Sequence, residues 1–515
     1  MVESSKLTSN SFSMKTASSY IIPADFPDSD IIRVDDTYYM VSTTMHFIPG
    51  CVILRSHNLV NWEHAAYVYD ELEATEKETL ADNKGAYGKG MWAACLRHHN
   101  GKFYISFVAN DTHKTYLFTS EKIEGPWHRS EIKGFYHDMS LLFDDDGKVY
   151  CVSGNMNITL TEMEADLSGP KAGGVNKVII QDNPEIVILG YEGSHIYKIN
   201  GKYYIFFIHI PKGKMRTQAC FVSDKIDGPY TGKDVLCSDL AGWNSGTAQG
   251  GIVQAADGNW FSIVFQDHGA LGRIPVLVPV RFVDDFPVFG AAGFAPREVN
   301  VPDLRPDYQY KPLYSNDFTN PAWQWNHIPN RDLVRVDAST FTVKTDKRVT
   351  NVVQAANTLT QRTFTEHCAG RVTLDASNIN EGDITGLCAL EGEYGFIGIT
   401  KKDGKYKLIT AEHKIPYTPW SMGVYDDEKA VITAEKEIDT PKISLKATFC
   451  LEHNKENVQF AYFDDKSGEY IDFGEAVKLR YTLDQFVGVR FALFCFSTKN
   501  VGGKAIFNDF ELELL

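Results

Sequence analysis

The hydrophobic pattern along the first 290 residues is that of short strands, with almost no helical periodicity. One unit recurs five times: an apolar strand, a tight turn in which Asn or Asp precedes Gly or Asp, and a second strand that opens with an aromatic residue. Such turns between alternating runs are the strongest local signal of a β-hairpin. The five units read IIRVDDTYYMVS, CLRHHNGKFYISF, LLFDDDGKVYCVS, IYKINGKYYIFF and IVQAADGNWFSIV.

The spacing of these units, roughly fifty residues of strand with no covering helix, predicts a propeller in which each unit is one blade. Three units continue into a further strand with a closing aromatic residue, as the outer edge of a four-stranded blade would: RSHNLVNWE, TSEKIEGPWH and VSDKIDGPY. The third unit lacks this ending. We predict a five-bladed β-propeller over residues 19–300, after a Ser- and Thr-rich disordered tail at residues 1–18.

The second half of the chain is also built of strands. A Pro-rich polar linker, VPDLRPDYQYKP, covers residues 301–312. Beyond it come alternating runs such as GRVTLDAS, ISLKATFCLEH and AIFNDFELELL, each with one apolar face. The whole chain is therefore predicted to be all-β, with an antiparallel β-sandwich over residues 313–515.

Acidic residues stand at a constant distance from the aromatic pairs. Trp92, Asp138, Glu192 and Gln249 each lie twelve residues before the second member of a pair, and Asp28 lies eleven before it. The first strands of propeller blades all run the same way along the central channel, so residues just before them should surround one opening. Three carboxylates and a tryptophan are thus expected to converge. The alternative is that each acid only caps a turn at a strand start.

Converging carboxylates suit glycoside hydrolysis, which needs one carboxylic acid to protonate the leaving oxygen and one carboxylate to act as base or nucleophile. Asp28 and Glu192 come from blades one and four, so they should face each other across the opening with room for a water molecule. That arrangement predicts inversion, with Asp28 as general base and Glu192 as general acid. Asp138 is expected to raise the pKa of Glu192 by like-charge repulsion.

Composition and charge limit the classes of molecule that this protein is expected to bind. A net charge of −16 disfavours DNA, RNA and anionic membranes, and a small neutral oligosaccharide fits better. No segment approaches the roughly 18 apolar residues of a membrane span. The N-terminus has no signal-peptide pattern, so a cytoplasmic location is expected unless a leader was removed. The nine scattered cysteines include no CxxC pair and indicate neither a zinc site nor a disulfide framework.

Three motifs resemble the acidic signatures of glycoside hydrolase family 43: PDSDIIRVDDTYYM, HDMSLLFDDDGKVY and EGSHIYKINGKYYIFF. The segments MWAACLRHHNGKFY, GPWH and QDHGALGRIPVLVPVRF support the resemblance, which spans residues 20–300. It implies a five-bladed inverting enzyme, mostly β-xylosidases, α-L-arabinofuranosidases and arabinanases. The family's base, modulator and acid fall on Asp28, Asp138 and Glu192. Ser29 departs from the Pro that often follows the base.

The same resemblance suggests substrate contacts. Trp92 would stack on or wall the sugar, and its alternative is a rim aromatic packed between blades. Arg273 would hydrogen-bond sugar hydroxyls, or else pair with one of the acids. His46 and Phe47, in the loop after the second strand of blade one, would shape the pocket, and Gln249 is a polar contact or a turn residue.

The resemblance also suggests that the protein could bind calcium as a structural ion. His268 is similar to a residue that in some members ligates a central ion, although a channel histidine is more often only hydrogen-bonded. LYSNDFTNPAWQWNHIPN resembles the start of the concanavalin A-like jelly-roll domain attached to many family members, where Asp317 and Asp509 could hold calcium near the first and last strands. No cofactor is expected for the chemistry itself.

We expect an exo-acting β-xylosidase that cuts short oligosaccharides, because the C-terminal domain would wall one side of the pocket. An α-L-arabinofuranosidase, or an enzyme with both activities, is the main alternative. A non-catalytic sugar-binding propeller is a more distant one, and a scaffold for protein partners has no support beyond the propeller itself. The fructan-cleaving propellers would need NDPNG, RDP and EC signatures, which are absent. The sequence leaves homo-oligomerisation open.

Overall fold

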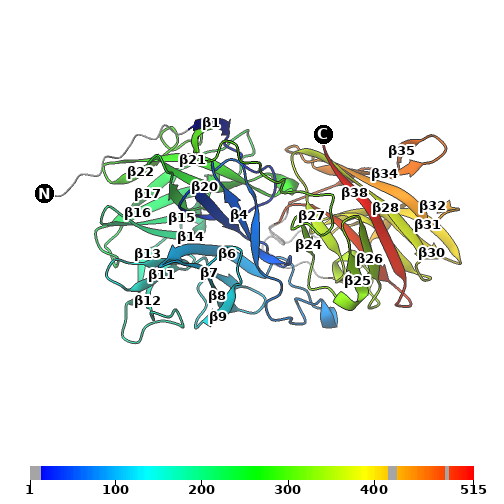
Figure 1. Cartoon of the computed structure of the whole chain (residues 1–515), viewed down its shortest axis with the longest axis horizontal. Helices are drawn as coiled ribbons and strands as arrows, with labels where there is room; N and C mark the ends of the chain where they lie inside the picture. The colour runs from blue at the N-terminus through cyan, green and yellow to red at the C-terminus, as the bar shows by residue number, and fades with distance from the viewer. Residues whose placement is uncertain (1–12, 416–425, 482–486) are drawn as a thin grey trace.

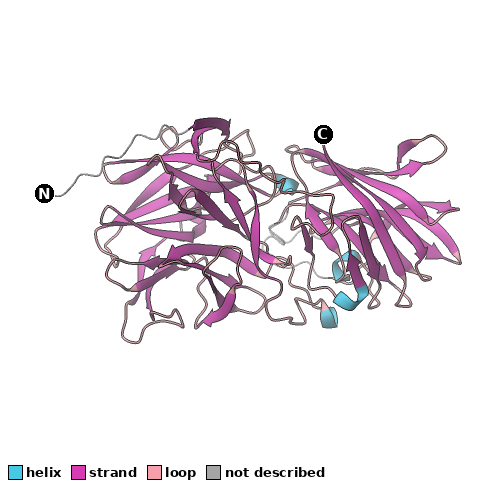
Figure 2. Ribbon diagram, viewed as in Figure 1, coloured by secondary structure: helices cyan, strands magenta, loops and turns pink. Residues whose placement is uncertain are grey.

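The computed structural model describes residues 13–415, 426–481 and 487–515. Two β domains lie side by side, the propeller in blue to green and the second domain in yellow to red (Figure 1). Strands dominate the described residues (Figure 2), which contain four single turns of 3-10 helix: Ala81–Asn83, Gly269–Leu271, Arg331–Leu333 and Val352–Gln354. Among these residues no helix is long and apolar enough to cross a membrane.

The prediction of five blades is confirmed, each blade being an antiparallel sheet. The third unit, which lacks the closing aromatic residue, is nevertheless a full four-stranded blade. In blade five the innermost strand is split, because β18 and β19 both pair with β20. The strands are β2 Asp30–Val34, β3 Thr37–Ser42, β4 Gly50–Ser56 and β5 Glu63–Tyr69; β6 Met91–His99, β7 Lys102–Ala109, β8 Lys114–Ser120 and β9 His128–Ile132; β10 Ser140–Phe143, β11 Val149–Ser153, β12 Asn157–Met163 and β13 Asn176–Gln181; β14 Val187–Ile199, β15 Lys202–Pro211, β16 Thr217–Ser223 and β17 Thr231–Leu236; β18 Thr247–Ala248, β19 Ile252–Gln254, β20 Trp260–Asp267, β21 Arg273–Val283 and β22 Phe286–Phe289.

The N-terminal tail differs from expectation. Residues 13–18 were predicted to be disordered, but they form strand β1 (Ser13–Ser18), which pairs with β23 (Glu298–Asp303). Thr16 donates a hydrogen bond to Asn300 across this pair at 2.6 Å. The side chains of β1 are mostly polar and largely exposed, and its partner strand lies far along the chain. Local composition therefore did not indicate a strand here. Strand β23 also extends into the expected linker; residues 1–12 lie outside the described part.

The second domain is the predicted sandwich, made of two antiparallel sheets among the described residues. One sheet has the order β24-β27-β37-β29-β30-β31-β32, and the other has the order β25-β26-β38-β28-β33-β34-β35, with β36 also paired to β34. Their strands are β24 Trp323–Trp325, β25 Val334–Val336, β26 Thr340–Lys344, β27 Leu359–Arg362, β28 His367–Asn378, β29 Asp383–Leu390, β30 Tyr394–Lys402, β31 Lys405–His413, β32 Val431–Ile438, β33 Lys442–Cys450, β34 Asn457–Asp464, β35 Glu469–Asp472, β36 Val477–Lys478, β37 Arg490–Ser497 and β38 Lys504–Leu514.

The two domains share a buried boundary. Ala270, Leu271 and Ile274 of the propeller belong to the same apolar core as the strands of the sandwich. Arg362 of the sandwich lies over the Phe26 ring at 4.3 Å, and its Nε donates to a propeller carbonyl at 2.7 Å. Burial of apolar surface of this kind stabilises the junction, so the sandwich is held against the propeller rather than tethered to it.

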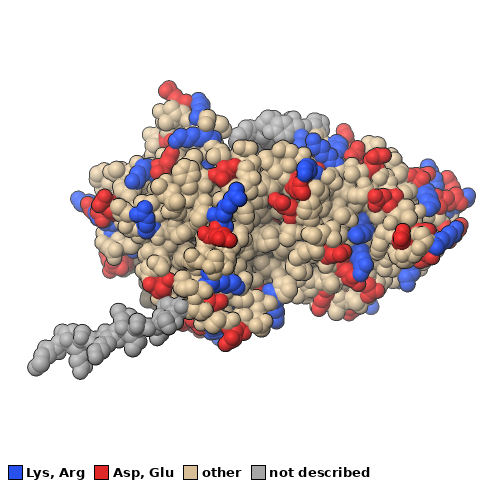
Figure 3. Space-filling view, turned by 90° about the horizontal axis from the view of Figure 1, so that it is seen from above, with Lys and Arg blue, Asp and Glu red and all other residues tan. Residues whose placement is uncertain are grey.

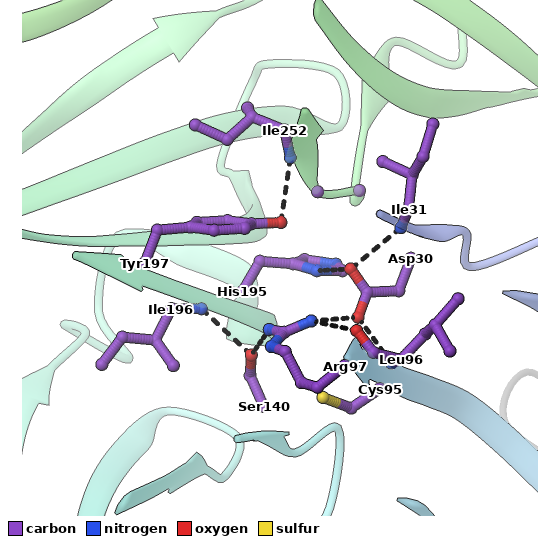
Figure 4. Close-up of polar contacts among 12 residues, drawn as sticks. Asp30, Ile31, Cys95, Leu96, Arg97, Ser140, His195, Ile196, Tyr197 and Ile252 are labelled. Carbon is purple, nitrogen blue, oxygen red and sulfur yellow. Dashed lines mark hydrogen bonds and ion pairs between the residues drawn. The ribbon is translucent and has the colours of Figure 1, made fainter. Parts of the chain in front are cut away.

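A buried ion-pair network joins the innermost strands of the propeller (Figure 4). Asp30, at the start of β2, accepts a hydrogen bond from Arg97 of β6 at 2.7 Å and lies 3.1 Å from Nδ1 of His195 on β14. The backbone N–H of Leu96 donates to the same carboxylate. Burial alone would raise the pKa of Asp30, but the charges of Arg97 and His195 hold it well below its usual range.

The network continues through the remaining blades. Arg97 Nη2 donates to Ser140 Oγ of blade three at 2.6 Å, and the N–H of Ile196 in blade four donates to the same oxygen at 3.0 Å. Tyr197 then accepts a hydrogen bond from the N–H of Ile252 in blade five at 3.0 Å. All five blades are thus joined through a few buried polar groups.

Replacement of Asp30 by Asn should destabilise the propeller strongly. The change removes the charge that partners the buried Arg97, and breaking a buried pair in this way costs about 3–5 kcal/mol. Urea unfolding followed by tryptophan fluorescence measures the loss. The matched control is Asp145→Asn, whose side chain is 86% exposed and should change the stability by less than about 0.5 kcal/mol. Equal midpoints for the two variants would contradict this role.

Candidate active site

A backbone feature repeats in every blade, just before or within its innermost strand. One residue there has a positive φ in the left-handed region, which costs a non-glycine residue roughly 1–2 kcal/mol. Such strain is retained where surrounding structure imposes it, and it often accompanies functional sites. The five residues are Asp28 (54°), Ala93 (38°), Asp138 (48°), Gly193 (62°) and Gln249 (62°).

These same five residues line one small cavity, together with Ala94, Met139, Ser194 and His195. Two of the predicted site residues, Trp92 and Glu192, directly precede the left-handed residue of their blade. Glu192 pairs with Ile208 between two breaks in the register of β14 and β15. The constant spacing seen in the sequence therefore corresponds to a repeated turn around a shared opening.

Asp28 is held by an arginine from blade five. Arg273 Nη1 donates to Asp28 Oδ1 at 2.8 Å, and both side chains are buried. Arg273 also lies 3.2 Å from Asp267 and 4.5 Å above the Phe265 ring. Its Nε donates to the hydroxyl of Tyr481 at 3.3 Å. Since Tyr481 belongs to the sandwich, the second domain contacts the residue that orients Asp28.

Asp138 and Glu192 form a cluster with a histidine. Asp138 Oδ2 accepts a hydrogen bond from the N–H of Gly193 at 3.0 Å. His137 Nε2 lies 3.6 Å from Asp138 Oδ2 and 3.3 Å from Glu192 Oε2. Asn155 also donates to Glu192 Oε2. One donor or acceptor atom of each of the three residues His137, Asp138 and Glu192 lies within 4.8 Å of the others.

The charges in this cluster shift its proton equilibria. Burial, with repulsion from Glu192 and Asp28, raises the pKa of Asp138 to about 6, although His137 works in the opposite direction. Burial by itself would lower the pKa of His137, but the neighbouring carboxylates raise it to about 9. At neutral pH the imidazole is therefore charged, and the cluster is one positive group between two acids.

The other predicted contacts lie around this centre. The Trp92 ring is 6.3 Å from the His137 ring in an edge-on arrangement. Gln249 lines the cavity, and its N–H donates to Gln218 at 2.7 Å. Both residues are therefore next to the three acids, as their spacing predicted.

His46 and Phe47 lie farther back, at the domain boundary. His46 Nε2 is 3.2 Å from the side-chain oxygen of Asn326 in the sandwich, and Arg490 lies 3.5 Å above the Phe47 ring. Neither residue is among those that line the cavity. Phe47 belongs to a small apolar cluster against which Trp92 packs, so it supports the pocket wall from behind instead of forming it.

His268 and Asp317, two of the predicted calcium ligands, have hydrogen-bond partners within the protein, and calcium binding at these residues stays a prediction. His268 stacks on Trp243 at 4.3 Å and lies 3.3 Å from the side-chain oxygen of Gln266, and burial lowers its pKa to about 3. Asp317 accepts two hydrogen bonds from Thr319. Calcium needs six to eight oxygen ligands. Within the described ranges, neither group of three or more clustered ligand side chains includes His268, Asp317 or Asp509.

Sequence reasoning missed several residues of the centre. His137 directly precedes Asp138 in the quoted motif, so its nearness was available, but the motif gave no reason to assign it a role. Asn155 and Asp267 carry no periodic signal. Tyr481 comes from the other domain, and only the tertiary structure brings it to Arg273.

Comparison with known proteins decides the family. Residues 18–287 match the family described as glycosyl hydrolases family 43, and residues 313–513 match the β-xylosidase C-terminal concanavalin A-like domain. The chain belongs to glycosyl hydrolase family 43. It is thus a glycoside hydrolase, and the predicted all-β fold of propeller and concanavalin A-like sandwich is confirmed.

The proteins similar to this family 43 chain include one named as a β-xylosidase and one named as an α-L-arabinofuranosidase. A β-xylosidase of Formosa agariphila is 26% identical over 94% of this chain and 88% of its own length. A non-reducing end α-L-arabinofuranosidase of Bacteroides ovatus is 27% identical over 68% of this chain and 70% of its own. The solved structure of a bifunctional GH43-CE protein of Bacteroides eggerthii is 38% identical, with a TM-score of 0.87 over 98% of this chain. This chain spans 64% of that longer protein.

The pH dependence of kcat/KM in this family 43 enzyme should change when the positive charge of His137 is removed. The pKa of Asp138 is raised to about 6, so the acid cluster loses a proton as the pH rises through that value, and kcat/KM should fall there. Removal of a neighbouring cation disfavours the ionised acids, so His137→Gln should move this fall to higher pH. Profiles on an aryl glycoside measure the shift, with exposed His128→Gln as the control. An unchanged or lowered midpoint in His137→Gln would contradict the assignment.

Proposed function

We propose that this enzyme is an inverting, exo-acting glycosidase that removes terminal xylose from β-1,4-xylo-oligosaccharides. The observation that carries the proposal is the convergence of acids from blades one, three and four. Asp28 and Asp138 line one cavity, and the Glu192 carboxylate lies beside that of Asp138. Glycoside hydrolysis by inversion needs such a pair of carboxyl groups, separated by roughly 6.5–9.5 Å, with a water molecule between base and sugar.

We assign the general base to Asp28. In the proposed step Asp28 takes a proton from water as the water oxygen attacks the anomeric carbon, and the bond to the leaving oxygen breaks on the opposite face. Arg273, at 2.8 Å, orients the carboxylate for this role. Because orientation of a reacting group contributes strongly to rate, the contact of Tyr481 with Arg273 gives the sandwich domain an indirect part in catalysis.

We assign the general acid to Glu192, which gives its proton to the leaving oxygen. Both hydrogen-bond partners found for Glu192, His137 and Asn155, contact Oε2. Oε1 is therefore the oxygen that we assign to proton delivery. Asp138 acts as modulator: its like charge favours the protonated form of its neighbour, and its bond from the Gly193 N–H holds it in place.

Exo action is supported by the neighbouring domain, which contacts the residue that holds Asp28. Tyr481 reaches Arg273 from the sandwich side. A chain end would then enter the pocket while the rest of the oligosaccharide stays outside.

An α-L-arabinofuranosidase is the second candidate. Xylopyranose and arabinofuranose present similar hydroxyl groups, and the names of the relatives from Formosa agariphila and Bacteroides ovatus support one sugar each. Parallel measurement of kcat/KM on 4-nitrophenyl β-xyloside, 4-nitrophenyl α-L-arabinofuranoside and xylobiose ranks the two. Faster cleavage of the arabinoside would favour the second candidate without changing the roles of the acids.

The roles of the two acids can be separated by leaving-group dependence. Asp28→Asn should lower kcat by about 10²–10⁴-fold on both xylobiose and the 4-nitrophenyl glycoside, since water attack is needed in each. Glu192→Gln should cost much more on xylobiose than on the 4-nitrophenyl glycoside, because nitrophenolate leaves without protonation. Glu185→Gln, an exposed carboxylate on the same blade, is the control. Near-normal turnover of xylobiose by Asp28→Asn or Glu192→Gln would refute the assignment.

The stereochemical proposal has a direct test. Proton NMR spectra recorded in the first minutes of xylobiose hydrolysis should show α-xylose as the first product from the non-reducing end, before mutarotation equilibrates it. Release of β-xylose first would mean retention through a covalent intermediate, which requires carboxyl groups only about 5 Å apart. In that case Asp28 would be a nucleophile and not a base.

A further inference from the structure

Three metal-binding side-chain types share one outer face of the sandwich, far along the chain from the three acids. His367 of β28 lies directly opposite Cys450 of β33 in the antiparallel register. Directly opposite residues project on the same face of a sheet, as do residues two apart along an extended strand. Glu452 lies just past the end of β33, and its carboxylate comes back to Cys450 and His367, while Leu451 between them is buried.

The geometry of this group is compact. The ring nitrogen of His367, the sulfur of Cys450 and a carboxylate oxygen of Glu452 all lie within 4.8 Å of one another. His367 Nε2 is 2.8 Å from Glu452 Oε1. Tetrahedral zinc binds nitrogen, oxygen and sulfur at about 2.0–2.3 Å, which separates its ligands by roughly 3.3–3.8 Å. Rotations of partly exposed side chains can close that difference.

We propose that His367, Cys450 and Glu452 bind a divalent transition-metal ion of the Zn²⁺ class, with water as the fourth ligand. One imidazole, one thiolate and one carboxylate form a mixed donor set that suits zinc and not calcium or magnesium, which prefer oxygen alone. On binding, the Cys450 thiol releases its proton to solvent, and the metal replaces the contact between His367 and Glu452. Lys455 also pairs with Glu452, through the other oxygen, Oε2.

The proposed site lies at the start of the loop after β33, and this loop contacts the propeller. His453, the next residue after Glu452, stacks on Trp243 of the propeller with ring centroids 4.8 Å apart. Trp243 in turn stacks on His268. A metal that ties Glu452 to two strands would hold this loop in place, so the ion acts as a clamp on the domain junction and raises the stability of the folded chain.

Cysteine spacing gave no indication of this site. Zinc motifs are recognised in sequence by closely spaced ligands, whereas His367 and Cys450 belong to separate strands and meet only through sheet pairing. The catalytic cluster of His137, Asp138 and Glu192 also groups three ligand side chains, but it contains no sulfur. A readout that depends on sulfur therefore distinguishes the two.

Titration of the metal-free full chain with Co²⁺ tests the proposal. A thiolate bound to Co²⁺ gives a charge-transfer band in the near ultraviolet, and the band should saturate at one equivalent in the wild type. Cys450→Ser should abolish the band. Cys237→Ser is the matched control, because Cys237 is a second partly exposed free cysteine outside both ligand groups, and it should leave the band unchanged. A wild type without the band, or a Cys450→Ser variant that keeps it, overturns the proposal.

Three further measurements show whether misfolding, and not the loss of a ligand, abolishes the band. Hydrolysis of an aryl glycoside by metal-free Cys450→Ser should equal that of metal-free wild type, since none of the three ligands touches the catalytic centre. His367→Gln keeps the thiol and should weaken Co²⁺ binding at least tenfold. Added Zn²⁺ should raise the melting temperature of the wild type and of Cys237→Ser but not of Cys450→Ser. Equal Co²⁺ affinity in His367→Gln, or an equal Zn²⁺ response in Cys450→Ser, refutes the site.

Discussion

The buried carboxylate of Asp30 is the interaction on which the rest of the site depends. It ties blade one to blades two and four through Arg97 and His195, and the network sits directly after the acids in sequence. Asp28 lies two residues before Asp30, and Asp138 lies two before Ser140. Strand geometry over so few residues is stiff, so the polar bonds between inner strands also set the separation of the carboxylates. The distances between the proposed catalytic carboxylates are therefore fixed by residues one layer below them.

The second domain completes this support from the other side. Arg273 holds Asp28 and is itself contacted by Asp267 and by Tyr481 of the sandwich. The domain boundary is apolar core with buried arginines, and acidic and basic side chains are interspersed on the outer face of both domains (Figure 3). A boundary of this kind resists relative motion more than a polar one. The sandwich therefore belongs to the active-site architecture and is more than an appended module.

The blades and the positions of the acids could be predicted from the sequence, because the sequence patterns that indicate them are local. Hairpin turns and aromatic pairs define the blades, and the left-handed residue that recurs in each blade explains why Asp28 and Asp138 keep the same spacing. The failures are those of long-range contact. Strand β1 is polar and pairs with a segment near residue 300, so composition suggested disorder. Phe47 packs behind Trp92 at the domain boundary, and no sequence pattern tells which loop faces the other domain.

The charges around Glu192 show why the sequence, which suggested only repulsion between Asp138 and Glu192, did not predict the electrostatics of the site. Two carboxylates alone would repel, and the sequence supported only that effect. His137 adds a cation between them, with a pKa raised to about 9, while the pKa of Asp138 is raised to about 6. Below that lower value the cluster is neutral overall, with one acid proton and one imidazolium. A neutral sugar that displaces water from the cavity penalises charged carboxylates further. In the proposed mechanism, substrate binding thus favours the state in which Asp138 and Glu192 share one proton, and no sequence motif contains that coupling.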